Sequence, residues 1–408
     1  MSDRSVLQNP AFRRLLAARF LLTLAVQVQS LAVAWQVFSL TGKPLDLGMV
    51  GLAHFVPMAG LSLLAGQVAD RRNPTIVLAC AEGALWLSAL ALAALAWVGT
   101  STGPIYAIIV AIGAARAFSG PANTALLPQI VAAEDLPAAI TWGSGSWQVG
   151  MVAGPALGGL LYTAFGGPTG VYLFAVGLLT VALGPLLSLP ARTVAAESKA
   201  ATWSTVFEGI RYVFSDRILL GAISLDLFAV LLGGAVALLP IYAEEILKTG
   251  PWGLGLLRAA PGVGAACMAV WLGRNPIRHH AGRILFGSVA MFGLFTIAFG
   301  RSNHFWLSLL FLLGLGASDM VSVVVRHTLL QLHVPPEMRG RVGAVSQVFI
   351  GASNELGEFE SGLTADRLQT RPAVVLGGVG TLAVVALWSV FFPQLRNIDR
   401  LEDRPQGR

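Results

Sequence analysis

The sequence has 408 residues, of which 55% are hydrophobic and only 12% are charged, whereas a soluble domain carries about 25% charged residues. Apolar runs of about 20 residues recur along the whole chain, which excludes a water-soluble fold. The net charge of +6 is spread over short loops, so nucleic acid is not an expected partner. Cys80 and Cys267 both lie in apolar runs, which excludes a disulfide framework and a cysteine zinc site.

The apolar runs predict an all-α integral membrane protein with twelve transmembrane helices. The first six spans are expected at roughly 16–40, 46–69, 75–98, 104–127, 138–164 and 170–189. The second six are expected at roughly 218–245, 252–273, 282–300, 304–330, 342–365 and 372–392. This predicts an N-terminal six-helix half (1–189), a cytoplasmic linker (190–216) and a C-terminal six-helix half with a cytoplasmic tail (217–408). Residues 202–216 suit an amphipathic helix on the membrane surface and a flexible polar tether equally well.

The distribution of Lys and Arg predicts the orientation. With both termini in the cytoplasm, the cytoplasmic segments hold 18 of these residues, the opposite face holds 5, and the remaining 4 lie within the spans. Cytoplasmic loops are enriched in Lys and Arg. We therefore expect a multi-pass protein of the cytoplasmic (inner) membrane with both termini inside.

An internal repeat divides the chain into two halves. Residues 126–134 (LLPQIVAAE) recur as 329–337 (LLQLHVPPE) at an offset of 203, and residues 72–74 (RNP) recur as 274–276 at an offset of 202. Two matches at nearly the same offset indicate two six-helix units in parallel repeat. Transporters with this plan bind substrate between the halves near the membrane midplane.

Three segments resemble motifs of the major facilitator superfamily. Residues 66–74 (GQVADRRNP) are similar to the loop after that family's second helix, although 73–75 (NPT) replace a Gly and two basic residues. Residues 116–120 (RAFSG) resemble its Arg-x-x-x-Gly element. Residues 150–159 (GMVAGPALGG) match the GxxxGPxxGG part of the motif typical of exporters and antiporters.

Within that superfamily the chain resembles the enterobactin-exporter branch, at residues 9–13, 18–20 and 335–341. The resemblance implies secondary active export of a small molecule, driven by proton exchange. We expect a monomer whose partners are a small-molecule substrate, protons and the lipid bilayer, with no cofactor and no metal.

Two groups of residues are candidates for gating. Asp70, at the end of the second span, could interact with a helix N-terminus. The resemblance suggests the region of Gly340 and Arg341 as its partner. The alternative is an ordinary charged loop. The first group comprises Gly66, Asp70 and Arg71. The second group lies in span five, where small residues allow close helix packing and a proline allows a bend: Gly150, Gly154, Pro155, Gly158 and Gly159. Plain helix packing would need the same glycines.

Charged side chains within the spans are candidates for proton coupling or substrate binding, because a charge at that depth is costly unless it is paired or wetted. Arg116 could bind an anionic substrate or act in coupling, or could pair structurally with Glu82. Asp226, Asp319 and Arg326 are further candidates, with a structural Asp–Arg pair as the alternative.

Span eleven carries an unusual acidic cluster. Glu355 and Glu358 are three residues apart on one helical face, with Asn354 beside them and Glu360 pointing elsewhere. Adjacent carboxylates at low dielectric raise one another's proton affinity, which suits a proton carrier; the alternative is a solvated cluster near the outer end of the helix. Two glutamines in span one could bind a ligand or form an interhelical contact, namely Gln27 and Gln29.

Several catalytic motifs are absent from the sequence. It has no G-x-x-x-x-G-K-[ST] loop for ATP, no HExxH and no G-x-S-x-G element, so an enzyme is not expected. The sequence favours a proton-driven exporter of a siderophore-like compound or drug. The alternatives are a proton-coupled importer of a small polar solute, or a lipid-moving or receptor-like membrane protein.

Overall fold

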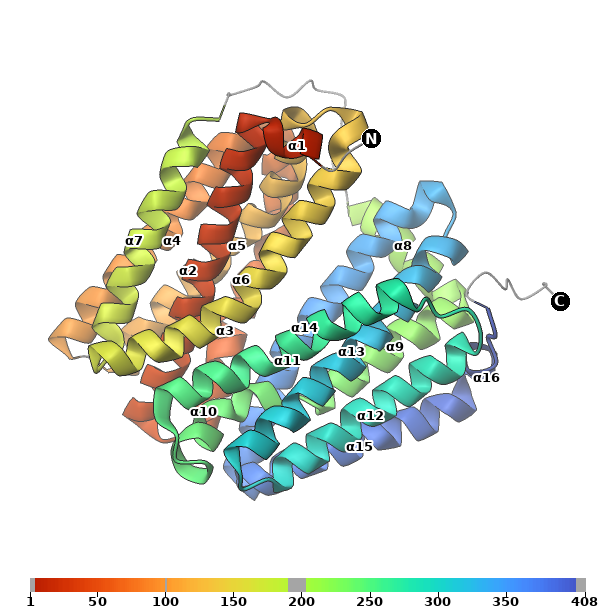
Figure 1. Cartoon of the computed structure of the whole chain (residues 1–408). Coiled ribbons are helices and arrows are strands. Elements are labelled where there is room, and N and C mark those ends of the chain that lie inside the picture. The colour runs from red at the N-terminus through yellow and green to blue at the C-terminus, as the bar shows by residue number, and fades with distance from the viewer. Residues whose placement is uncertain (1–3, 100, 190–202, 401–408) are drawn as a thin grey trace. The chain divides into compact units, whose positions relative to one another are not determined.

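A computed structural model of the chain describes residues 4–99, 101–189 and 203–400 (Figure 1). The side chains of a few residues inside the helices, among them Asp70, lie outside this description. Throughout the described ranges the chain forms helices joined by short turns, with no strand. The predicted all-α class is therefore confirmed.

The helices before residue 190 are long and closely spaced. They are α1 (Arg4–Gln8), α2 (Pro10–Thr41), α3 (Pro44–Arg71), α4 (Pro74–Val98), α5 (Thr102–Ile130), the 3-10 turn η1 (Ala133–Asp135), α6 (Leu136–Phe165) and α7 (Pro168–Leu187).

The helices after residue 202 include one interrupted segment, in which a 3-10 turn and a π-helical turn follow α9. They are α8 (Trp203–Ser215), α9 (Arg217–Leu232), η2 (Ala235–Leu238), α10 (Leu239–Ile241), η3 (Tyr242–Ile246), α11 (Gly250–Arg274), α12 (Ala281–Arg301), α13 (Phe305–His333), α14 (Pro336–Leu368), α15 (Thr370–Phe391) and α16 (Pro393–Arg396).

Local sequence signals explain where several helices begin. Pro10 and Pro74 stand at the first positions of α2 and α4, where a missing N–H removes no helical hydrogen bond. The side chain of Asn9 accepts hydrogen bonds from two backbone N–H groups of the first turn of α2, and Asn73 accepts one from Thr75 N at 2.9 Å. These caps satisfy donors that the helix itself leaves unpaired.

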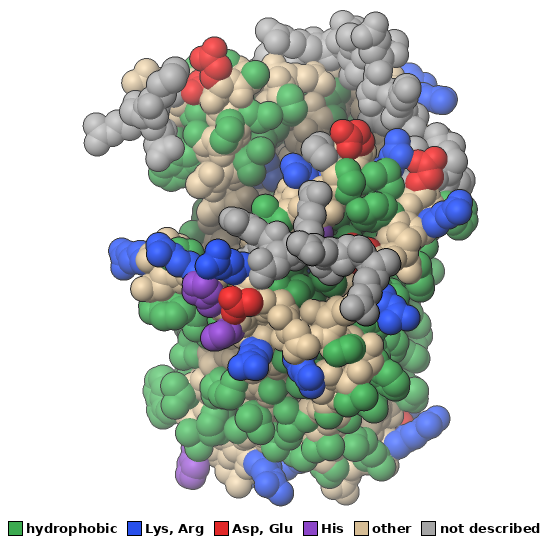
Figure 2. Space-filling model, turned by 90° about the vertical axis from the view of Figure 1, so that its right-hand side faces the viewer, with side chains coloured by type: hydrophobic (Ala, Val, Ile, Leu, Met, Phe, Trp, Pro, Cys, Tyr) green, Lys and Arg blue, Asp and Glu red, His purple; other side chains and the backbone are tan. Residues whose placement is uncertain are grey.

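Ten helical segments of the described chain are long and apolar enough to cross a membrane. Of the twelve predicted spans, those in α6 and α14 fall outside this set. Helix α14 carries several acids and basic residues, and α6 is rich in Gly, Ser and Trp, which have low hydropathy. Hydrophobic side chains cover much of the face shown in Figure 2, as lipid exposure requires.

The chain divides into two compact units. Unit 1 comprises residues 1–42, 53–201 and 250–259, and unit 2 comprises 43–52, 202–249 and 260–408. The units differ from simple sequence halves because the first turns of α3 group with unit 2 and the first turns of α11 with unit 1.

Each unit has its own apolar core. In unit 1, α2 packs against α6 and α7, and α4 packs against α5 and α7; the core includes Leu15, Leu78 and Leu126. In unit 2, α12 packs against α13 and α15, and α9 packs against α14 and α15; Leu225 and Leu329 are buried there.

The second part of the predicted linker is helical. Helix α8 packs against α14 and α9, and Glu208 forms an ion pair with Arg341 of α14. A Cβ added at Gly209 would lie 2.9 Å from the carbonyl oxygen of Arg341, so the two helices approach closely there. Residues 190–202, the first part of the predicted linker, lie outside the described residues.

The segment after α16 covers the start of α12; we call this contact the C-terminal clasp. Ala281 N donates a hydrogen bond to the carbonyl oxygen of Asp399, and Gly282 N donates to that of Ile398, both at 3.0 Å. The carboxylate of Asp399 contacts Nδ1 of His279 at 3.0 Å and Nδ1 of His280 at 2.8 Å. The clasp thus satisfies helix N-terminal donors that would otherwise have no partner within α12.

Candidate functional site

A buried ion pair lies inside unit 2. Arg326 Nη1 of α13 is 2.6 Å from Asp226 Oδ2 of α9, and the two side chains are only 9% and 7% exposed. Arg326 Nε also donates a hydrogen bond to Ser322 Oγ at 3.3 Å, one turn earlier on α13. Such a pair is stable away from water only because each charge compensates the other.

A second carboxylate, Asp319, adjoins this pair. Asp319 and Asp226 line the same small pocket between α9, α12 and α13, together with Ser318 and Ser322. Asp319 is close enough to interact electrostatically with both Asp226 and Arg326. Two carboxylates and one guanidinium therefore lie in one buried cluster.

The local sequence explains how this cluster is assembled. Ser318, Ser322 and Arg326 follow one another at intervals of four residues along α13, so they share one face of the helix. That face meets α9 at Asp226. His327, the residue after Arg326, also interacts electrostatically with both members of the pair. Sequence reasoning did not single out His327, Ser318 or Ser322, although the four-residue spacing of the polar residues was a usable signal.

The two acids predicted on span eleven converge on one glycine. A Cβ added at Gly51, in the first turns of α3, would lie 2.9 Å from Glu358 Oε2 and 3.3 Å from Glu355 Oε2. The absence of a side chain at Gly51 thus makes space for both carboxylates. The neighbouring Asn354 is exposed and donates to the carbonyl oxygen of Ile350 at 2.9 Å.

Glu360 of α14 has a separate environment. Its Oε1 accepts a hydrogen bond from Thr364 Oγ1 at 2.7 Å, one turn further along the helix. The structure therefore distinguishes Glu360 from the other two acids, as the helical spacing predicts.

The glycines of the exporter-type motif lie against α2 and the start of α11, within unit 1. A Cβ added at Gly150 would lie 2.9 Å from Thr23 Cγ2, and one at Gly154 would collide with Gln27 Cβ. A Cβ at Gly158 would lie 3.2 Å from the backbone of Val28. Gly159 lies against Pro251 and Gly255, and Pro155 is buried beside them. The motif therefore produces a close helix contact, which both the gating and the packing interpretations require.

The predicted polar residues of span one have different surroundings. Gln27 is half-buried against Gly154, and Gln29 is buried. A third glutamine, Gln36, was not singled out from the sequence, yet its Oε1 accepts a hydrogen bond from the hydroxyl of buried Tyr172 at 2.7 Å. This pair of neutral groups links α2 to α7 inside unit 1.

Arg116 does not pair with Glu82. Its Nη1 lies 3.3 Å from Nε2 of His54 on α3, whereas neither carboxylate oxygen of Glu82 has a hydrogen-bond partner among the described residues. Glu82 is therefore not the carboxylate that forms a hydrogen-bonded pair with Arg116.

The loop motif after α3 is only partly described. Arg71 ends α3 and is exposed, and a Cβ added at Gly66 would meet no atom within 4 Å among the described residues. The side chain of Asp70 lies outside the described residues. Arg341, in the region suggested as its partner, forms the ion pair with Glu208.

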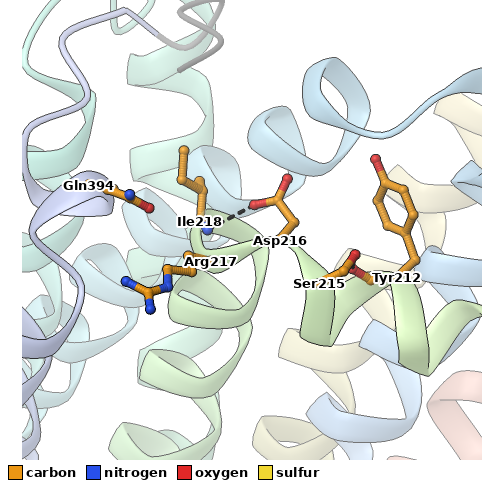
Figure 3. A pocket seen from close by; sticks show the side chains of 6 residues that line it. All are labelled: Tyr212, Ser215, Asp216, Arg217, Ile218 and Gln394. Atoms are coloured by element: carbon orange, nitrogen blue, oxygen red, sulfur yellow. Dashed lines mark hydrogen bonds between the residues drawn. The ribbon is translucent and has the colours of Figure 1, made fainter. Parts of the chain in front are cut away.

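A wide surface pocket lies where α8 turns into α9 (Figure 3). Its lining includes Tyr212, Asp216 and Gln394. Asp216 caps α9, accepting hydrogen bonds from Ile218 N at 2.8 Å and Leu219 N at 3.1 Å. Helix capping accounts for this carboxylate, so the buried cluster on α9 and α13 is the stronger candidate site.

Known proteins resemble the chain over nearly its whole length. The profile of the family described as "Transmembrane secretion effector" matches residues 1–407. The protein named Enterobactin exporter EntS from Citrobacter koseri is 25% identical over 401 residues, covering 98% of this chain and 96% of that protein.

Solved transporter structures share the fold. The nucleoside transporter NupG aligns with a TM-score of 0.68 at 16% identity, covering 94% of this chain and 99% of the other. A bacterial homologue of the iron transporter ferroportin, in an inward-facing state, aligns with a TM-score of 0.68 at 18% identity, covering 95% and 99%. The chain belongs to the transmembrane secretion effector family of the major facilitator superfamily of membrane transporters.

Proposed function

We propose that the protein is a proton-driven exporter of a small molecule in the cytoplasmic membrane, with twelve transmembrane helices, two six-helix halves that alternate access, and both termini in the cytoplasm. The internal repeat, the excess of cytoplasmic Lys and Arg in this topology, and relatives named as exporters support the proposal. Helices α6 and α14 supply the two spans beyond the ten apolar ones.

The single observation that carries the proposal is the buried cluster of unit 2, in which Asp226 pairs with Arg326 and Asp319 lines the same pocket as Asp226. Asp226 and Asp319 both act on Arg326, and burial makes an uncompensated charge costly. With both acids ionised, the cluster has a net charge of −1. Binding of one proton makes the cluster neutral, which is the condition that an apolar interior favours.

The cluster couples proton binding to side-chain position. When Asp226 takes up a proton, its attraction to Arg326 falls, and the guanidinium turns toward Asp319. When the proton leaves, the ion pair between α9 and α13 re-forms. A proton thus changes which helices are held together, and this differential interaction is what shifts a conformational equilibrium.

Other residues contribute to gating and to a second proton site in this proposal. Glu355 and Glu358, which converge on Gly51, form an additional acidic pair, and Asn354 and Arg116 contribute polar contacts to the substrate. The close contact of Gly154 with Gln27 seals one state of the cycle, and Asp70 with Arg71 helps to close the cytoplasmic side.

The cargo that fits this proposal is a siderophore-like compound. The support is that relatives at 25% to 28% identity are named as enterobactin exporters. A hydrophobic drug is the second cargo, because the exporter-type motif of α6 is not specific for one substrate.

Transport into inverted vesicles tests the proposal. Vesicles with an acidic lumen should accumulate enterobactin or a hydrophobic cationic dye, and Asp226→Asn or Asp319→Asn should abolish accumulation while exchange without a pH gradient persists. Glu360→Gln is the matched control, because that acid is held by Thr364. Accumulation that ignores the pH gradient would contradict proton coupling, and net movement in the opposite direction would identify an importer.

If the Asp226 and Asp319 variants keep the normal pH profile, the coupling role passes to the acidic pair of α14. Glu355→Gln and Glu358→Gln are then the decisive changes, because glutamine keeps the shape and the hydrogen-bonding capacity. Normal pH profiles in all four variants would exclude both clusters as the coupling site.

A further inference from the structure

Glu82 is an acid buried inside unit 1, and no described residue forms a hydrogen bond with its carboxyl group. Its side chain lies on α4, the residue is 0% exposed, and neither Oε1 nor Oε2 has a hydrogen-bond partner among the described residues. An ionised carboxylate in such surroundings would be far more costly than a neutral acid, because nothing replaces the water that it loses. The surroundings of Glu82 therefore select the protonated form.

The helices that pack against α4 carry one cation, Arg116, which forms no hydrogen bond with the Glu82 carboxyl. These are α5 and α7, and the titratable side chains that they carry are Tyr106, Arg116 and Tyr172. Arg116 contacts His54, and the hydroxyl of Tyr172 donates a hydrogen bond to Gln36. Tyr106 interacts with another group and forms no hydrogen bond with Glu82. Within the described residues, the Glu82 carboxyl is therefore removed from water with no hydrogen bond in its place.

Two more buried oxygens without partners lie on the same pair of helices. They are Thr75 Oγ1 on α4 and Asn123 Oδ1 on α5. Thr75 and Glu82 are seven residues apart, so they share one face of α4 two turns apart. Val77 of α4 and Ala122 of α5 belong to one packed cluster, which brings the two helices together at this level. Buried polar atoms that lack protein partners are usually satisfied by ordered water.

We propose that Glu82 is a proton-binding site of unit 1, which exchanges its proton through water held at Thr75 and Asn123. The ligand is H⁺, and the bond formed is the O–H bond of a neutral carboxylic acid. A role of Glu82 in coupling depends on the proposed export function, whereas the binding of a proton by Glu82 does not.

Infrared spectroscopy of the purified full chain in lipid discs tests proton binding directly. A neutral carboxyl group has a carbonyl band that a carboxylate lacks. Glu82→Gln should remove one such band at neutral pH, and Glu134→Gln, which changes an exposed acid of η1, should remove none. Identical spectra for the wild type and Glu82→Gln would overturn the proposal, whatever the transport assay gives.

Exchange into D2O tests the water route. The Glu82 carbonyl band should shift on deuteration, and Asn123→Leu should slow this shift at least several-fold without removing the band. An unchanged rate in Asn123→Leu and in Thr75→Val would overturn the route.

Thermal unfolding gives a second measure of proton binding. A proton held by folded Glu82 and released on unfolding makes wild-type stability fall as the pH rises above about 4. Glu82→Gln lacks this dependence. As the pH rises from 6 to 9, the melting temperature of the variant should therefore increase relative to that of the wild type. Parallel melting curves at every pH would count against the proposal.

A chemical probe of the wild type covers the case in which Glu82→Gln does not fold. A carbodiimide adds to a neutral carboxyl group, and mass spectrometry should find the adduct on Glu82 and not on Glu134. The reverse pattern would contradict the proposal.

Discussion

The interiors of the two units hold their buried acids in opposite ways. In unit 2, Asp226 lies 2.6 Å from Arg326, so its charge is compensated by a neighbour. In unit 1, Glu82 is fully buried and lacks a partner among the described residues, so its charge is removed by a proton. The two buried acids thus differ in what lies beside them, because a guanidinium contacts Asp226 whereas no described group hydrogen-bonds the carboxyl of Glu82.

The largest expected effect comes from removing the counter-charge in unit 2. Arg326→Leu leaves Asp226 buried and unpaired, which should destabilise the protein by about 3–5 kcal/mol. Glu82→Leu removes an acid without a partner and should cost far less. Thermal unfolding of the purified variants measures both effects.

The double change Asp226→Leu with Arg326→Leu is the control for this prediction. Because it removes both charges together, it should recover most of the lost stability. If Arg326→Leu alone were as stable as the double variant, the contrast between the two units would disappear.

An intermediate effect is expected at the neutral pair of unit 1. Gln36→Leu leaves the buried hydroxyl of Tyr172 without its acceptor, which should cost about 1–3 kcal/mol. Adding Tyr172→Phe removes the orphaned hydroxyl and should restore part of this loss, as chemical denaturation can measure. A larger loss in the double variant than in Gln36→Leu would show that the two side chains contribute by packing instead.

The smallest effect is expected at the C-terminal clasp, where the charges meet water. The hydrogen bond from the His279 side chain and that from the backbone N–H of His280 lower the pKa of Asp399 to about 2, below its ordinary value of about 3.9. A lowered pKa means that the stabilisation is complete above about pH 4 and is lost as the pH falls through about 2. The clasp should therefore be insensitive to the ionisation of Asp399 between pH 5 and pH 8.

A spin label at the exposed position Gln394 reports on the clasp. Asp399→Asn should increase the mobility of the label at pH 7, because the asparagine carries no charge to attract His279 and His280. Asp216→Asn, on another element, is the control. Equal mobility in the Asp399 variant and the wild type would mean that the backbone contacts of Ala281 and Gly282 hold the segment alone.

The sequence predicts the helices better than it predicts their contacts. Long apolar runs define the elements, whereas the start of α2 at Pro10, capped by Asn9, lies before the predicted first span. Most of the helices carry apolar residues on all sides, so the sequence does not indicate which side of a helix faces the core. The partner of Arg326 lies on another helix, at Asp226, and no spacing within one helix reveals that.

The candidate site was therefore predictable as a set of residues that includes an Asp–Arg pair, but the sequence did not determine which Asp contacts Arg326. Charged residues in apolar runs identified Asp226, Asp319 and Arg326, because such residues are costly in lipid. The contact of Arg116 with His54 of α3, and the lack of a hydrogen bond to Glu82, have no signature in the sequence. The meeting of Glu355 and Glu358 at Gly51 depends on the close approach of α3 to α14, which requires tertiary structure.

The C-terminal clasp has a practical consequence for protein engineering. Because the backbone of Ile398 and Asp399 accepts hydrogen bonds from the first turn of α12, a chain shortened to end at Arg396 would expose those amides and weaken the fit of α16 beside α12. A chain ending at Arg400 would keep every one of these contacts. A purification tag or a fluorescent fusion partner therefore belongs after residue 400, where it leaves the start of α12 covered.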